Sequence, residues 1–472
     1  MDRNTKRRCG RPHRDSDTAI STFSGGKFMA FDILIDNGII ITVNHSFEII
    51  RNGWIGISGD RIAALGSMAQ TADRPPAGKV VDAAGCILLP GLINAHTHLP
   101  MSLFRGLTDD LPLIEWLEKH IFPAEAAFIT PETVRPATLL SCAEMLLSGT
   151  TTCCDGYFLE SDVAGAVRDS GMRAVLGQGV IDYPAPGVPD PSQNIEVARS
   201  FLSEWTHLSS QIRPSLFCHS PYTCSEETLL RTKALCRETG VRFQIHAAET
   251  KWEYDHLMET KGTTPIGYLD RLGLLDPETM LVHAIWVDED DIERIYRSGA
   301  SVVHTAQSAM KLASGIAPIE RYIELGIPTA LGTDGSASNN TLDMFREMDI
   351  TAKLHKIANQ DPTVLNSRTV IEMATIQAAR AIGLEREIGS LEVGKKADLV
   401  ILDAARPHLA PLYHPESQIV YAARGADVRD TMVDGNWLVR NGKCIAFDLE
   451  GVQAEVRRIA DDIRRKGPES HR

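Results

Sequence analysis

Six side chains of the kinds that bind metals or move protons follow short apolar runs along the sequence. His96 and His98 close the first of these runs, residues 92–98. Later runs end at or just before the other members of the set, which are His246, Glu249, His283 and Asp334. Because side chains two apart in a strand point to the same side, His96 and His98 can face one metal ion. Imidazole and carboxylate groups are the usual ligands of a catalytic ion such as zinc.

Each of these residues also has a structural interpretation when it is taken singly. An isolated His-x-His pair is a weak signal, and a buried histidine often bonds only to a backbone carbonyl. In this chain, however, every member of the set falls at or near the expected end of a strand. That joint placement favours a metal-dependent catalytic site over coincidence.

The elements that must position these residues alternate between strand-like and helix-like segments over 89–388. One helix is predicted after the N-cap Ser225, and another runs from the N-cap Asp288 to a stop at Gly299. Repeated strand–helix units indicate an α/β fold with a parallel sheet, either open or closed. The polar residues lie at the C-terminal ends of the strands, which is where (β/α)8 barrels build their active sites.

The two ends of the chain are rich in short β-like runs. Residues 30–88 contain predicted turns at Asn37-Gly38 and Gly59-Asp60, and residues 389–447 contain a predicted hairpin over 431–439. We expect both ends to join in one small β domain. Residues 448–472 are predicted to form a C-terminal surface helix. Residues 1–29 carry many arginines and no apolar run, which predicts a disordered tail.

Composition excludes several classes of protein. The formal net charge of -14 argues against nucleic acid as a partner. No apolar stretch reaches the roughly 18 residues that span a bilayer, and the first residues lack the apolar core of a signal peptide. The nine cysteines form no Cys-x-x-Cys pair, which indicates reduced thiols in a cytoplasmic protein.

The ordered set of His-x-His, His-x-x-Glu, strand-end His and Gly-Thr-Asp-Gly resembles the amidohydrolase superfamily. More narrowly, it resembles the mononuclear aminohydrolases that include methylthioadenosine/S-adenosylhomocysteine deaminases, s-triazine hydrolases and guanine deaminases. The resemblance covers about 30–447. It implies a (β/α)8 barrel over 89–388 and a small β-sandwich domain formed from both termini.

The resemblance also implies that one divalent metal is bound, expected to be Zn2+ with Fe2+ or Mn2+ as alternatives, by His96, His98, His246 and Asp334. Such an ion lowers the pKa of bound water from about 15.7 toward about 7. A two-metal site in this superfamily uses a carboxylated lysine on the fourth strand. The matching stretch 214–219 contains no lysine, so a single metal is favoured.

The remaining residues of the set are implied to move protons. Glu249 would contact the substrate and carry the proton of the attacking water to a ring nitrogen, and His283 would orient that water. Asp334 would help to protonate the departing ammonia.

Three further residues match positions that contact the nucleoside in the deaminase group. Trp116 would pack near the nucleoside, Glu125 would accept hydrogen bonds from the ribose hydroxyls, and His219 would also touch the substrate. The alternative interpretation, without the resemblance, is that these residues are a core tryptophan, a surface glutamate and a histidine in a capped loop.

Two departures from the family pattern bear on the substrate. S-adenosylhomocysteine deaminases use arginines after the third strand to hold the amino-acid carboxylate, but residues 174–198 contain no Arg or Lys, and Gln178 stands at one expected position. A neutral substrate is therefore favoured. Relatives also read His-Asn-Pro-x-Ser-Asn-x-Lys-Leu, where Thr305 and Ala309 replace both asparagines. This change alters the pocket near the metal and leaves room for another heterocycle.

We therefore expect an aminohydrolase that converts a 6-aminopurine nucleoside, such as 5′-methylthioadenosine or adenosine, to the oxo product and ammonia. The alternatives are a hydrolase of s-triazines or other N-heterocycles, a guanine- or cytosine-type deaminase, a ring-opening cyclic amidase, and an inactive scaffold on the same fold. The expected partner is a small-molecule substrate, with neither nucleic acid nor membrane. The resemblance also implies a homo-oligomer.

Overall fold

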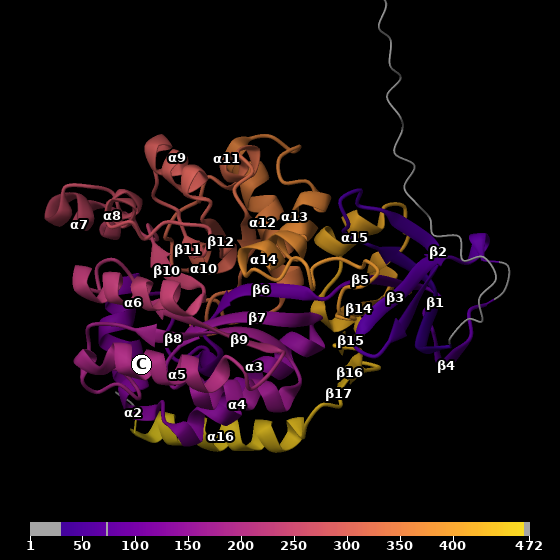
Figure 1. Cartoon of the computed structure of the whole chain (residues 1–472), viewed down its shortest axis with the longest axis horizontal. Helices are drawn as coiled ribbons and strands as arrows, with labels where there is room; N and C mark the ends of the chain where they lie inside the picture. Colours follow the sequence, from indigo (N-terminus) through magenta and orange to yellow (C-terminus); the bar gives the residue numbers. More distant parts are fainter. Residues whose placement is uncertain (1–29, 72–73, 467–472) are drawn as a thin grey trace, which may run out of the picture.

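The larger part of the molecule is a barrel of parallel strands (Figure 1). The computed structural model describes residues 30–71 and 74–466. Within them, eight parallel strands neighbour one another in sequence order. The strands are β6 (Leu92–Thr97), β7 (Thr150–Tyr157), β8 (Arg173–Val180), β9 (Ile212–Cys218), β10 (Phe243–Ala247), β11 (Thr279–His283), β12 (Ser301–His304) and β13 (Thr329–Leu331).

The first and last strands of the barrel meet, so the sheet closes. Asp334 N donates a hydrogen bond of 3.0 Å to His96 O, and Asn94 Nδ2 donates one of 2.7 Å to Thr333 Oγ1. Gly332 makes this approach possible, because a Cβ at that position would lie 2.8 Å from His96 N. The sequence alone left an open or a closed sheet possible, and the expected (β/α)8 barrel is confirmed.

Helices cover the outside of the barrel and are capped as the sequence predicts. Ser225 accepts a hydrogen bond from Thr228 N, and Asp288 accepts one from Asp291 N. The helices are α3 (Pro131–Leu147), α4 (Glu160–Ser170), α5 (Asn194–Trp205), α6 (Glu226–Thr239), α7 (Lys251–Lys261), α8 (Pro265–Arg271), α9 (Glu289–Ser298), α10 (Ala306–Lys311), α11 (Ile319–Glu324), α12 (Met344–Asn359), α13 (Ser367–Met373) and α14 (Ile376–Ala381).

A second domain combines strands from both ends of the chain, as expected. Nine of the described strands are hydrogen-bonded into one mixed sheet. The sheet curls back on itself, because Ile62 N donates to Lys395 O at 2.9 Å and Ala397 N to Asp60 O at 2.8 Å. The strands are β1 (Phe31–Ile41), β2 (Ile49–Ser58), β3 (Arg61–Ser67), β4 (Ala77–Asp82), β5 (Cys86–Pro90), β14 (Leu399–Asp403), β15 (Val428–Val433), β16 (Asn436–Arg440) and β17 (Lys443–Cys444).

The turn predicted at Asn37-Gly38 is wrong. Strand β1 continues through these residues, and its pairing with β2 shifts register on both sides of Gly38. Asn37 has a φ of 64°, so the Asn-Gly signal marks a left-handed residue inside a bulged strand, not a chain reversal. The turn at Gly59-Asp60 and the hairpin over 431–439 are confirmed by the loops between β2 and β3 and between β15 and β16.

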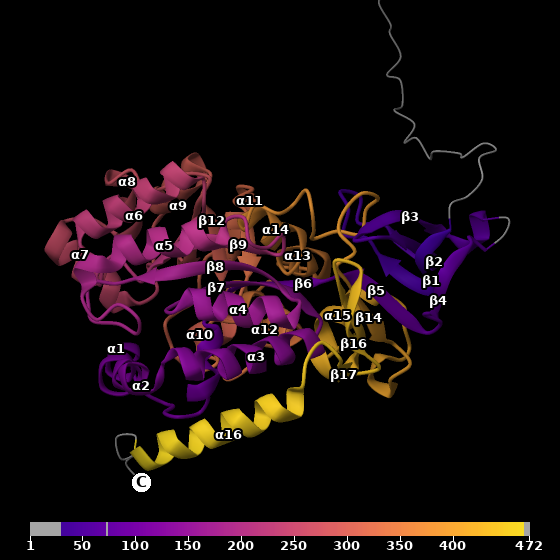
Figure 2. The ribbon, with the colours of Figure 1, turned by 60° about the horizontal axis from the view of Figure 1, so that its bottom comes forward.

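Buried ion pairs join the two domains at the N-terminal end of the barrel. Arg173, the first residue of β8, donates to Asp398 at 2.8 Å and to Asp434 at 2.6 Å. The C-terminal helix α16 (Leu449–Lys466) then crosses back to the barrel and packs on α3, as Figures 1 and 2 show. The disordered tail predicted for 1–29 and the end of the C-terminal segment, 467–472, lie outside the described residues.

A helical segment between β6 and α3 covers the opposite end of the barrel. It consists of η2 (Leu99–Phe104), α1 (Leu113–Trp116), the π-helical turn η3 (Leu117–Ile121) and α2 (Phe122–Phe128). The smaller helix α15 (Pro415–Tyr421) follows β14. Among the residues that the structure describes, no helix is both long and apolar enough to cross a bilayer.

Candidate active site

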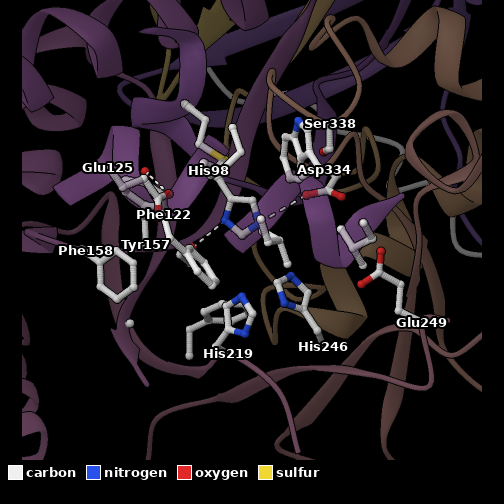
Figure 3. A pocket seen from close by; sticks show the side chains of 18 of the residues that line it. His98, Phe122, Glu125, Tyr157, Phe158, His219, His246, Glu249, Asp334 and Ser338 are labelled. Carbon is white, nitrogen blue, oxygen red and sulfur yellow. Dashed lines mark hydrogen bonds and ion pairs between the residues drawn. The ribbon is translucent and has the colours of Figure 1, made fainter. Parts of the chain in front are cut away.

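Three histidines, His96, His98 and His246, and an aspartate, Asp334, converge at the C-terminal ends of the barrel strands. Figure 3 shows His98, His246 and Asp334 of this group. His96 Nε2 lies 3.2 Å from His246 Nε2, and His98 Nε2 lies 3.2 Å from Asp334 Oδ1. The same Asp334 oxygen lies 3.6 Å from His96 Nε2. The strand-face argument for His96 and His98 therefore holds, because both rings reach the same point.

This arrangement fits a divalent cation. Ligands about 2.05 Å from a tetrahedral centre lie roughly 3.3 Å from one another, which is close to the separations found here. Three imidazole nitrogens and a carboxylate oxygen suit zinc and related ions. Among the described residues, His96, His98 and His246 form the one group of three or more metal-binding side chains whose ligand atoms lie within 4.8 Å of one another.

Neighbouring groups orient two of these ligands. His98 Nδ1 lies 2.6 Å from Gly156 O, so the ring donates there and turns Nε2 toward the cluster. Ser308 Oγ donates to Asp334 Oδ2 at 2.7 Å, and Gly335 N donates to Asp334 Oδ1 at 2.7 Å. His98 and Asp334 are therefore held in place before a cation binds.

Burial and the aspartate set the charge of the cluster. Burial lowers the pKa of His96, and burial together with the charge of His96 holds the pKa of His246 well below its usual value. Burial would raise the pKa of Asp334, but hydrogen bonds from His96 and His98 outweigh it and hold that pKa well below its usual value. Burial would lower the pKa of His98, but its hydrogen bond to Asp334 and the charges of Asp334 and Asp155 together outweigh burial and raise that pKa. The two neutral imidazoles of His96 and His246 beside an ionised carboxylate suit a cation.

Glu249 and His283 stand beside the cluster as a second pair. Glu249 Oε2 lies 3.7 Å from His283 Nε2, and His283 Nδ1 is hydrogen-bonded to Thr305 Oγ1 at 3.0 Å. Burial, with the charge of Asp334, raises the pKa of Glu249 well above its usual value. Burial lowers the pKa of His283 to about 3, so this ring is neutral. Glu249 therefore keeps a proton to higher pH than an ordinary glutamate, while His283 offers only hydrogen bonds.

The backbone is strained where it presents these side chains. Ala248, His283 and Asp334 have φ values of 55°, 76° and 63°, which non-glycine residues rarely adopt. Such strain is kept where surrounding contacts fix the backbone, and it gathers at functional sites. Around Ala248, the contacts are hydrogen bonds from Ala248 N and Glu249 N to the carboxylate of Glu253, at 2.9 and 2.8 Å.

A largely apolar cavity opens over the cluster, and its wall contains all four residues predicted to contact the substrate, Trp116, Glu125, His219 and Glu249. Figure 3 shows the last three. Trp116 is 4% exposed and donates from Nε1 to Thr108 O at 3.0 Å. Glu125 is 5% exposed, so the surface glutamate of the alternative interpretation is wrong. Burial raises the pKa of Glu125 to about 7 although Tyr157 Oη donates to it at 2.5 Å. His219 is hydrogen-bonded to Thr223 Oγ1 at 2.9 Å.

Sequence reasoning missed the residues that support this site. Ser308 holds Asp334, Glu253 holds the backbone of Glu249, and Tyr157 holds Glu125. The sequence singles out none of them, although Tyr157 closes a buried strand and Glu253 follows Glu249 by four residues. Only contacts across the fold show which residue each one serves.

The structure also places the two departures from the family pattern. Thr305 bonds His283, so a hydroxyl serves where relatives have an asparagine, and Ala309 is buried. Gln178 is buried and hydrogen-bonded to Gly179 O at 3.1 Å, and it lines neither cavity near the site. The segment after β8 that does reach a cavity is 181–186.

The fold and this site define a barrel hydrolase with a side-chain cluster able to bind a metal at the C-terminal end of a (β/α)8 barrel. The model of the amidohydrolase family matches residues 87–438, and the chain belongs to that family. The resemblance deduced from the site residues is therefore confirmed.

Individual relatives match most of the chain. The 5-methylthioadenosine/S-adenosylhomocysteine deaminase of Syntrophobacter fumaroxidans is 43% identical over 92% of this chain and 98% of its own. The 5'-deoxyadenosine deaminase of Methanosarcina acetivorans is 40% identical over 92% and 98%. The zinc-bound adenosine deaminase structure from Xanthomonas campestris has a TM-score of 0.90 at 35% identity, covering 92% and 99%. The atrazine chlorohydrolase of Arthrobacter aurescens, at 21% identity with a TM-score of 0.84, shares the fold.

Proposed function

We propose that this protein is a zinc-dependent aminohydrolase that deaminates a neutral 6-aminopurine nucleoside, such as adenosine or 5′-methylthioadenosine, to the oxo product and ammonia. One observation carries the proposal. The four-ligand cluster and the Glu249–His283 pair face an apolar cavity whose wall also holds a buried carboxylate, Glu125. The similarity to proteins named as deaminases of adenosine-type nucleosides supports the same reaction.

The metal would be held by His96, His98, His246 and Asp334. A divalent ion bound there supplies Lewis acidity that makes water a nucleophile near neutral pH. The choice of Zn2+ over Fe2+ or Mn2+ rests on the nitrogen-rich ligand set and on the zinc in the adenosine deaminase structure.

Glu249 would take one proton from the attacking water and deliver it to the ring nitrogen beside the amino-bearing carbon. Its raised pKa suits a group that must both accept and release a proton near neutrality. The neutral ring of His283 would hydrogen-bond the water oxygen and fix its direction. The oxygen of the water would form a bond to the ring carbon that bears the amino group. The second proton of that water would then pass by way of Asp334 to the amino group, the carbon–nitrogen bond would break, and ammonia would leave.

The far side of the cavity would recognise the nucleoside. Glu125 would accept hydrogen bonds from the ribose hydroxyls, held in place by Tyr157. Trp116 offers an apolar wall for the ring, and His219 would contact the substrate from the opposite side. Homo-oligomerisation, a cytoplasmic location and the absence of a nucleic-acid partner stay predictions from the sequence.

The proposal is tested by ammonia release from zinc-loaded protein. Adenosine, 5′-methylthioadenosine, S-adenosylhomocysteine, guanine, cytosine and melamine are assayed beside a Glu249→Gln variant and a control variant of an exposed acid, Glu289→Gln. We expect turnover of the neutral adenosines, a loss of about 10²–10⁴-fold in Glu249→Gln with its zinc retained, and no loss in the control. Turnover of guanine, cytosine or the triazine without any adenosine would overturn the substrate assignment. Full activity of Glu249→Gln would overturn the proton path.

A further inference from the structure

The backbone that presents Glu249 is tied to the loops that follow β11 and α10. Ala248 O accepts hydrogen bonds from Ile285 N at 2.9 Å and from Trp286 N at 2.8 Å. The indole of Trp286 in turn donates from Nε1 to Ser314 O at 2.6 Å. A continuous set of hydrogen bonds therefore runs from the residue before Glu249 to Ser314.

The backbone of Ser314 is fixed by further contacts. Ser314 N donates to Ala309 O, in α10, at 2.9 Å. Gly315 has a φ of 138° and lies so close to the loop after β11 that a Cβ on it would come within 2.7 Å of Ile285 Cγ2. Because only a glycine allows this approach, packing as well as hydrogen bonding sets the position of Ser314.

The hydroxyl of Ser314 is buried beside the carboxylate of Glu249. Ser314 is 5% exposed, and its Oγ has no hydrogen-bond partner among the described atoms. Burial, with the charges of Asp334 and Glu253, raises the pKa of Glu249, whereas the Ser314 hydroxyl lowers it. A buried hydroxyl without a partner is costly, so we expect it to donate to the carboxylate next to it once that group is ionised.

Ser314 reaches Glu249 from outside the substrate cavity. Glu249 lines the cavity over the cluster, but neither Ser314 nor Trp286 belongs to the described wall. Another polar neighbour of this carboxylate is His283, whose Nε2 lies 3.7 Å from Glu249 Oε2. A hydroxyl outside the wall can therefore restrain the acid without taking space from the substrate.

We propose that Ser314 is a positioning residue for Glu249, and that Trp286 sets the place of Ser314. When Glu249 is ionised, the Ser314 hydroxyl donates to the carboxylate and holds it in the direction of the attacking water. Such restraint matters because a misplacement of about 1 Å can cost about 100-fold in rate. This assignment rests on the proposed function, since it requires Glu249 to carry the proton of that water.

The test separates kcat from KM in zinc-loaded protein, with adenosine or 5′-methylthioadenosine as the substrate. Ser314→Ala should lower kcat by about tenfold and leave KM and zinc content unchanged, because it alters neither the cavity wall nor the metal ligands. Trp286→Phe keeps an aromatic ring but removes the indole N–H, and it should lower kcat by about threefold. The control Ser298→Ala removes a hydroxyl bonded to Ile295 O at the end of α9 and should change neither constant.

A double variant shows whether Ser314 acts through Glu249. Adding Ser314→Ala to Glu249→Gln should cause no further loss of kcat, whereas the losses from two independent residues would multiply. An unchanged kcat in Ser314→Ala, a rise in KM alone, or a full further loss in the double variant would overturn the positioning role and leave the proposed function standing. If Ser314→Ala does not fold, an unchanged kcat in Trp286→Phe overturns the role equally. Full activity of Glu249→Gln would overturn both the role and the proposed proton path.

Discussion

The two ends of the barrel both bury charged groups, but they differ in whether those groups have partners of opposite charge within the chain. At the N-terminal end, Arg173 is paired with Asp398 and Asp434 of the β domain, and all three belong to the chain. At the C-terminal end, Asp334 is surrounded by three histidines, and two of them, His96 and His246, are kept neutral by burial. The first cluster needs nothing more, whereas the second still accommodates a cation.

The difference separates structure from function. A buried acid that has its own arginine fixes one domain on the other, and removing either partner leaves an unpaired buried charge. Asp334 and His98 are held in place by Ser308 and Gly156, and no lysine or arginine is paired with them in the described part of the chain. They are therefore arranged to bind a cation from solution. Four changes test this comparison, from the largest expected effect to the smallest.

The largest effect is expected from His246→Ala. Removing a ligand should weaken zinc binding by more than about 100-fold, because losing only a hydrogen-bonded support of a ligand costs up to that much. Turnover should be lost with the metal. Zinc content and chelator competition measure the effect, with the exposed His207→Ala as the control. Unchanged zinc affinity in His246→Ala would remove this histidine from the site.

A loss of stability without a loss of metal is expected from Arg173→Met. The substitution leaves the buried Asp398 without its cation, whereas Asp434 keeps Lys396 Nζ at 3.2 Å, and we expect a cost of about 3–5 kcal/mol in the free energy of unfolding. The control Arg199→Met breaks a pair whose members are 53% and 58% exposed and should leave the free energy of unfolding nearly unchanged. Urea denaturation measures both. If the two variants lose the same stability, the cluster at the domain junction is no more than a surface ion pair.

The pH dependence of stability should come from buried carboxyl groups, near the C-terminal end of the barrel, that have no lysine or arginine partner among the described residues. Burial raises the pKa of Glu347 from 4.5 to about 7. Between these values the folded state holds a proton that the unfolded state has released, so stability falls as pH rises. Over this pH range, the free energy of unfolding of the wild type should fall by about 3 kcal/mol more than that of Glu347→Gln. Denaturation of the metal-free protein at pH 4.5 and 7.5 measures it, and an equal fall in wild type and variant would contradict the assignment.

The smallest effect is expected from Ser308→Ala. Its hydroxyl donates to Asp334 Oδ2, the oxygen opposite the one that faces the histidines. Losing this support should weaken zinc binding by about 10–100-fold while the ligands stay in place. The matched control is Ser161→Ala, which removes an exposed hydroxyl bonded to Glu204. Equal zinc affinity in both variants would show that Asp334 needs no support from α10.

The sequence by itself determined the chemistry of this protein. Spacing and order placed His96, His98, His246, Glu249, His283 and Asp334 at expected strand ends, and the structure brings these six residues to one end of the barrel. The caps at Ser225 and Asp288 were equally clear, because they act within one helical turn. Asn37-Gly38 shows the limit of local signals, since a left-handed residue serves a bulge as well as a turn.

Only the tertiary structure decided which residues support the site and where its cavities form. Glu253, Ser308 and Tyr157 act through contacts with residues brought near by the fold, and no spacing predicts such a partner. Closure of the barrel depends on the approach of Gly332 to His96, far apart in the chain. A second cavity, next to the one over the cluster, likewise forms where α1, α2, the loop after β8 and α7 meet. Local sequence fixes side-chain chemistry, but a cavity exists only once distant segments pack together.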